Sequence, residues 1–258
     1  MWVIETVIVA FSMFSALPMP QIEWNEKNMR YAMCAFPLIG VVTGLAMWGW
    51  AAAAGVFHFP AMLKGAGFCL LPLVITGGIH LDGFADTFDA LSSHAEPEKN
   101  REILKDPHIG AFGVMHIGMY LIASFAVWTS LPRFRALPAI LMFALSRSLS
   151  GLAVTRFPLA KQTGLAYTFA SAADRRRAGN ALLILALALT AGLCLCGLAG
   201  AAMAAAAWGT FLWYFRMSKR EFGGLTGDLA GWFLVTAEFW MTAAWCLVSL
   251  CGGRFFDG

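Results

Sequence analysis

The sequence has 258 residues, of which 59% are hydrophobic and only 13% charged, and its mean hydropathy is +0.69. A soluble domain carries about 25% charged residues, so this composition excludes an ordinary soluble protein and predicts an all-α helix bundle that crosses a lipid bilayer several times. The net charge of +3, without basic repeats interleaved with aromatic residues, argues against a nucleic-acid partner.

The first apolar run, 1–17, ends at two prolines and carries Glu5, so it either spans the bilayer or lies in its interface. Seven further runs are each near the roughly 20 residues that a hydrocarbon core of about 30 Å requires. Gly40 and Gly44, in the first of these runs, form a G-x-x-x-G pair that indicates close helix packing. We therefore predict a single domain over 1–258, with about seven spans at 31–57, 62–79, 114–131, 136–154, 180–198, 199–215 and 229–250.

An acidic stretch, 77–113, lies directly beside one of these runs. Asp82, Asp86 and Asp89 are spaced i, i+4, i+7, which on an α-helix puts their carboxylates within a stripe roughly 60° wide. Like charges held that close need a cation to compensate them. Mg²⁺ prefers carboxylate oxygens and shares its ligand shell with substrate phosphates, so it is the predicted cofactor.

The second half of the acidic stretch carries a similar set of polar residues. Glu102 and Asp106 repeat the i, i+4 spacing, with Lys105 beside them. His80 and His108, one in each half, are candidates for proton transfer or phosphate binding.

The run GGLTGDLAG, 223–231, places a carboxylate after a glycine-rich turn at the mouth of the last span. Glycines let backbone N–H groups approach a phosphate, so Gly227 and Asp228 are predicted to bind substrate, and Asp228 also to bind its metal ion. An aspartate that merely caps the helix is the alternative.

Two charged residues lie well inside predicted spans, away from their first residues, where an unpaired charge is costly. Arg147 is expected to pair with a carboxylate or an anionic substrate, and snorkelling is the alternative. Glu238 either pairs internally or reaches the site.

Basic residues are distributed unevenly between the predicted loops. The loops on the side of the acidic stretch, 18–30, 81–112, 155–178 and 216–227, hold 13 Lys or Arg, and the opposite side holds four. By the positive-inside rule the acidic stretch faces the cytoplasm.

Three runs, GGIHLDGFADTFDAL, EILKDPHIGAFG and GGLTGDLAG, resemble the signature motifs of the cobalamin synthase family, the adenosylcobinamide-GDP ribazoletransferases, in sequence, order and separation. The resemblance covers essentially the whole chain. It implies a multi-pass enzyme of the bacterial inner membrane that uses Mg²⁺ to join adenosylcobinamide-GDP to α-ribazole, or its 5′-phosphate, with release of GMP.

Carried onto this sequence, the resemblance implies that carboxylates hold Mg²⁺ on the pyrophosphate, that one of them acts as general base, and that a cation such as Lys105 or Arg147 meets the charge of GMP. The predicted catalytic residues are Asp82, Asp86, Asp89, Lys105, Asp106 and Arg147; the predicted substrate-binding residues are His80, Glu102, His108, Gly227, Asp228 and Glu238; the predicted metal ligands are Asp82, Asp86, Asp89 and Asp228.

The sequence departs from the family pattern at Ala90, where glycine is usual, at His108, where arginine is common, and at Val235, where a polar residue is frequent. Two other classes stay open. A membrane transferase of the CDP-alcohol type also uses an aspartate-rich helix, but its D-G-x-x-A-R pattern is not reproduced here. An ion-coupled transporter would place its acids near the bilayer midplane, often with an internal repeat, and no repeat is present. A homo-oligomer is open as well.

Overall fold

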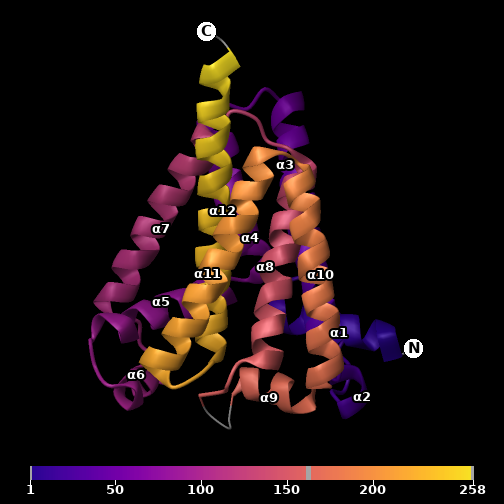
Figure 1. The fold of residues 1–258 in the computed structure, drawn as a ribbon, viewed down its shortest axis with the longest axis vertical. Helices are drawn as coiled ribbons and strands as arrows, with labels where there is room; N and C mark the ends of the chain where they lie inside the picture. Colours follow the sequence, from indigo (N-terminus) through magenta and orange to yellow (C-terminus); the bar gives the residue numbers. More distant parts are fainter. Residues whose placement is uncertain (1, 161–163, 257–258) are drawn as a thin grey trace.

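The computed structural model of the chain describes residues 2–160 and 164–256, and its helices pack as one bundle (Figure 1). This arrangement confirms the predicted all-α class. The helices are α1 (Trp2–Phe14), α2 (Glu26–Met29), α3 (Ala32–Val56), α4 (Ala61–Thr76), α5 (Ile79–Ser92), α6 (Pro97–Ile103), α7 (Ala111–Ser130), α8 (Ala136–Arg156), α9 (Leu165–Ala172), α10 (Arg175–Leu195), α11 (Leu198–Phe222) and α12 (Gly227–Phe256).

Six helices in the described ranges are long and apolar enough to cross a membrane, namely α3, α7, α8, α10, α11 and α12. Helices α4 and α5 meet the same criteria only as a pair, and the pair is bent by 94°. The described residues therefore hold six candidate spans, or seven if the bent pair counts as one, against about seven predicted. Helix α1 has 13 residues, too few to cross a core of about 30 Å, so the interfacial alternative fits the first apolar run better.

Helix α8 lies at the centre of the bundle, and most of its side chains are buried. Its backbone touches that of α3 at the G-x-x-x-G pair. A Cβ atom at Gly40 would collide with the carbonyl of Phe143, and one at Gly44 would collide with the backbone of Ile140. The close packing predicted from these two glycines is thus confirmed, and it leaves α8 largely out of contact with lipid.

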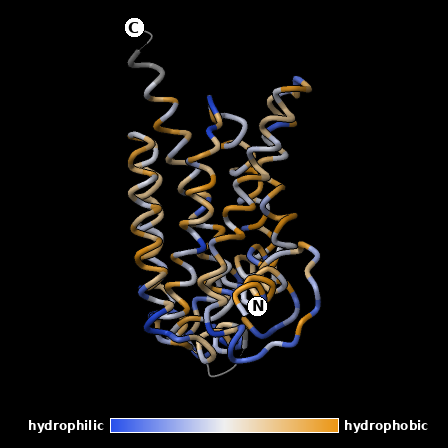
Figure 2. Tube along the Cα trace, turned by 90° about the vertical axis from the view of Figure 1, so that its right-hand side faces the viewer, coloured by the Kyte–Doolittle hydropathy of each residue, from blue (hydrophilic) through white to orange (hydrophobic). Residues whose placement is uncertain are grey.

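Polar residues gather at one end of the bundle (Figure 2). The short helices α2, α6 and α9 lie at this end, and α5 crosses the bundle near it (Figure 1). The connections that the charge count assigns to one side of the membrane thus share one end of the molecule.

Candidate active site

Two glycines turn the chain between α4 and α5. Gly77 has a φ of +64° and Gly78 a φ of +80°, and this left-handed region strains any residue with a side chain. The turn directs α5 across the bundle instead of continuing the span. The helix with Asp82, Asp86 and Asp89 therefore lies beside the first turn of α12.

Helices α5 and α12 cross in backbone contact. A Cβ atom added at Gly83 would lie 2.6 Å from the carbonyl oxygen of Asp228, and one added at Gly231 would lie 2.9 Å from that of His80. Side chains at either glycine would force the helices apart. The first and third motifs, distant in sequence, form a single site because these two positions are glycine.

The crossing gathers negative charge at the polar end. The carboxylates of Asp82, Asp228 and Asp89 all act electrostatically on Asp86. Asp82 is exposed, whereas Asp86 and Asp228 are half-buried. The hydroxyl of Thr226 accepts the backbone N–H of Leu229 and so caps α12, which means that Asp228 is not the cap.

Asp89 has a structural role that its spacing did not indicate. One of its carboxylate oxygens accepts the N–H of Gly110 at 2.8 Å, and the other accepts the N–H of Gly113 at 2.9 Å. A Cβ atom at either glycine would collide with this carboxylate. Asp89 thus caps the N-terminus of α7, where a negative charge is favourable, and ties α7 to α5. Its role as a metal ligand stays a prediction.

Glu102, near the end of α6, and residues 105–109 of the loop that follows are exposed. Helix α6 ends at Ile103, so Glu102 and Asp106 do not share a helical face despite their i, i+4 spacing. Glu102 pairs with Lys99 at 3.4 Å on the surface. Asp106 accepts hydrogen bonds from the backbone N–H and the ring of His108, and the backbone bond holds the pKa of its carboxyl below the usual value.

Arg147 and Glu238 form an ion pair inside the bundle. The guanidinium is 1% exposed and also donates to the carbonyl of Phe143 at 3.1 Å, while Ser146 donates to the carboxylate at 2.7 Å. Of the alternatives for these two residues, internal pairing is the one that the structure shows.

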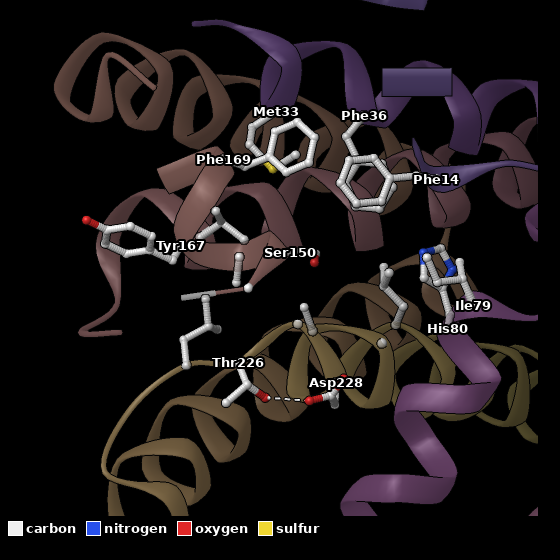
Figure 3. A pocket seen from close by; sticks show the side chains of 18 of the residues that line it. Phe14, Met33, Phe36, Ile79, His80, Ser150, Tyr167, Phe169, Thr226 and Asp228 are labelled. Atoms are coloured by element: carbon white, nitrogen blue, oxygen red, sulfur yellow. Dashed lines mark hydrogen bonds between the residues drawn. The ribbon is translucent and has the colours of Figure 1, made fainter. Parts of the chain in front are cut away.

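A cavity of about 400 Å³ opens beside the crossing of α5 and α12 (Figure 3). Asp82, His80, Gly227 and Asp228 line it, so four predicted site residues share one cavity. Its described lining residues include neither Glu102 of α6 nor any residue of the loop that follows, with Lys105, Asp106 and His108, and they do not include Arg147 or Glu238. Sequence reasoning missed the remaining polar and aromatic lining, which includes Phe14, Phe36, Ser150, Tyr167, Phe169 and Thr226. Of these, only Thr226 lies inside a recognisable motif.

The carboxylates at this cavity have the donor chemistry that Mg²⁺ requires. Within residues 2–160 and 164–256, no three His, Cys, Asp or Glu side chains form a ready metal-binding group. Mg²⁺ does not need such a cage, because it keeps several waters and is usually held by one or two carboxylates together with substrate phosphates. Asp82 and Asp228 on the cavity wall, with Asp86 beside them, fit this mode of binding.

Substitution of Gly83 by alanine is expected to destabilise the protein by about 1–3 kcal/mol, because the added methyl group overpacks a backbone contact. The measurement is the free energy of unfolding in mixed micelles. Gly118→Ala on α7 is the matched control: no neighbouring atom lies within 4 Å of its Cβ position, and alanine favours a helix over glycine by about 1 kcal/mol. Equal stability of the two variants would contradict the close crossing of α5 and α12.

Comparison with known proteins identifies the family of this site. The profile of the family described as Cobalamin-5-phosphate synthase matches residues 6–246. The chain belongs to this family. The match of the cobalamin-5-phosphate synthase profile runs from within α1 to within α12 and includes all three motifs.

This member of the cobalamin-5-phosphate synthase family is similar to several proteins named adenosylcobinamide-GDP ribazoletransferase. It is 39% identical to one from Lachnoclostridium phytofermentans, over 91% of this chain and 90% of that protein. It is 33% identical to one from Desulfitobacterium hafniense, over 86% and 89%, and 30% identical to one from Clostridium botulinum (strain Alaska E43), over 90% and 93%. No solved structure matches the chain.

Proposed function

We propose that this protein is a membrane transferase that moves the cobinamide phosphate part of adenosylcobinamide-GDP onto α-ribazole, or its 5′-phosphate, with release of GMP. The observation that carries the proposal is the meeting of Asp82 and Asp228, from two separate family motifs, at one cavity. Relatives that are similar over about nine-tenths of the chain are named for this activity. The same relationship disfavours a CDP-alcohol transferase and a transporter.

In the proposed reaction, a ribose hydroxyl oxygen of ribazole forms a bond to the phosphorus nearer the corrinoid. The bond from that phosphorus to the oxygen shared with GMP breaks, and GMP leaves with this oxygen. The proton of the hydroxyl passes to a carboxylate, for which Asp82 and Asp228 are the candidates on the cavity wall.

Asp82, Asp86 and Asp228 would hold Mg²⁺, which when bound supplies positive charge that offsets the pyrophosphate and the departing GMP. Asp89 would contribute indirectly, because its hydrogen bonds fix the position of α7 beside α5. Because Arg147 is paired with Glu238, Lys105 is the remaining predicted cation for GMP, and it lies on the exposed loop.

We place the protein in the bacterial inner membrane with this site facing the cytoplasm. Support comes from the loop charges, 13 Lys or Arg against four, and from the polar end of the bundle that includes the site.

The direct test is turnover by purified protein in lipid nanodiscs. Adenosylcobinamide-GDP, α-ribazole and Mg²⁺ should give equal amounts of GMP and the cobalamin product. Chelation with EDTA should abolish GMP release, and excess Mg²⁺ should restore it, because the carboxylates would otherwise face the pyrophosphate uncompensated. GMP release that needs no ribazole would indicate a hydrolase, and release that resists EDTA would argue against the metal.

A further inference from the structure

The cavity beside Asp82 and Asp228 has two chemically different sides. In Figure 3 the side chains of Phe14, Phe36 and Phe169 lie on one side, and Thr226 and Asp228 lie on the other. We infer that this cavity binds the aromatic base of α-ribazole, a dimethylated benzimidazole, and holds its ribose toward the carboxylates. The inference rests on the proposed function and assigns one of its two substrates to a place.

The apolar side is a cluster of aromatic rings that pack on one another, of which Phe36 and Phe169 are 3% and 2% exposed. The ring centroids of Phe14 and Phe36 are 4.6 Å apart, those of Phe14 and Phe169 are 5.2 Å apart, and the imidazole of His80 meets Phe36 edge-on at 6.0 Å. These rings come from α1, α3, α9 and α5. Elements so distant in sequence converge here on a surface that suits a flat, apolar heterocycle.

A polar side chain beside this surface is the imidazole of His80. His80 is 8% exposed, and its Nε2 has no hydrogen-bond partner in the described part of the chain. This buried nitrogen is closed to the cavity as the ring lies, so a ligand recovers the free energy of the missing hydrogen bond only by turning the His80 ring toward itself. A benzimidazole joined to ribose has one free ring nitrogen, an acceptor, and neutral imidazole with its hydrogen on Nε2 is a donor.

The same features disfavour the other parts of the two substrates. Guanine carries several donors and acceptors on its edge, and most of them would be left unpaired against phenylalanine side chains. The corrin ring with its side chains is far larger than a nucleoside, whereas about 400 Å³ lies near the lower end of the range for small-molecule pockets. A two-ring apolar base with a single acceptor matches the aromatic lining and fits the volume of the cavity.

With the base on the aromatic side, the sugar lies toward the opposite side of the cavity. Thr226 donates to Asp228 there at 3.4 Å, Asp82 lines the same space, and Ser150 lies between the two sides (Figure 3). A ribose hydroxyl would then be next to the carboxylates that are candidates to take its proton. The cavity thus positions the nucleophile rather than the phosphate donor.

The kinetic test separates the two substrates. Phe169→Ala should raise the KM for α-ribazole about ten- to a hundredfold, and His80→Phe, which keeps the ring but removes the donor, should raise it about three- to tenfold. The KM for adenosylcobinamide-GDP should stay within about twofold. Phe57→Ala is the matched control, because Phe57 is exposed at the far end of α3 and contacts only Phe59 among the ring pairs of the described residues. A rise in the KM for the corrinoid substrate instead would overturn the assignment.

A binding test does not depend on turnover. Equilibrium dialysis of α-ribazole alone against the protein in nanodiscs, with EDTA present, should show saturable binding that Phe57→Ala retains and Phe169→Ala weakens about tenfold or more. Free dimethylbenzimidazole should compete, and guanosine should not. If the parent protein turns over and ribazole binding is unchanged in both Phe169→Ala and His80→Phe, the inference about the cavity is refuted while the proposed function stands. Absence of turnover in the parent would instead count against the proposed function.

Discussion

Replacement of Asp82 or Asp228 by asparagine is expected to lower the rate of GMP release by about 10²- to 10³-fold. Asparagine has the same shape but no charge, so it binds Mg²⁺ weakly and takes no proton. Both carboxylates line the cavity, and both act on Asp86, so the loss of either removes charge from the same site. The measurement is single-turnover GMP release at saturating substrates, repeated over a range of Mg²⁺ concentrations.

Asp174→Asn provides the matched control for these two variants. Asp174 caps α10 by accepting the N–H of Arg177, and asparagine is an equally good N-cap residue. Its activity should remain within about twofold of the parent, since the cap bond is kept. If Asp228→Asn behaved like this control while Asp82→Asn lost activity, the third motif would have no part in the chemistry.

The helix that carries the aspartates could be predicted from the sequence because its spacing is a local property. The role of Asp89 could not, since its two partners, the N–H groups of Gly110 and Gly113, lie at the start of another helix, α7. The spacing of three carboxylates gives their arrangement on one helix. It does not indicate which of the three forms hydrogen bonds with other helices.

The glycine contacts likewise show that sequence reasoning predicts local patterns but not contacts between distant segments. The G-x-x-x-G pair on α3 is a recognised packing pattern, so its contact with α8 was predictable. Gly83 and Gly231 lie in separate motifs and become meaningful only when α5 crosses α12. The aromatic side of the cavity could not be predicted from the sequence for a further reason. Phenylalanine is abundant throughout this apolar chain, and no spacing distinguishes Phe14 or Phe169 from residues that face lipid.

Removal of one partner from the Arg147 and Glu238 pair is expected to cause the largest change in stability. Glu238→Leu should lower the free energy of unfolding by about 3–5 kcal/mol, because it leaves a guanidinium that is 1% exposed without its counter-charge. Arg147→Met should cost less, since the remaining carboxyl can take up a proton whereas a guanidinium cannot lose one. The measurement is unfolding by SDS in mixed micelles.

The double variant, Arg147→Met with Glu238→Leu, decides between a structural and a chemical role for this pair. It should recover most of the lost stability, because two apolar side chains replace two buried charges. As a control, Glu98→Gln removes the exposed partner of Arg101 and should change the free energy of unfolding by less than about 1 kcal/mol. If the double variant is stable and releases GMP at the parent rate, the pair serves the fold alone. A stable double variant that has lost turnover would return Arg147 to the catalytic site, where the sequence first placed it.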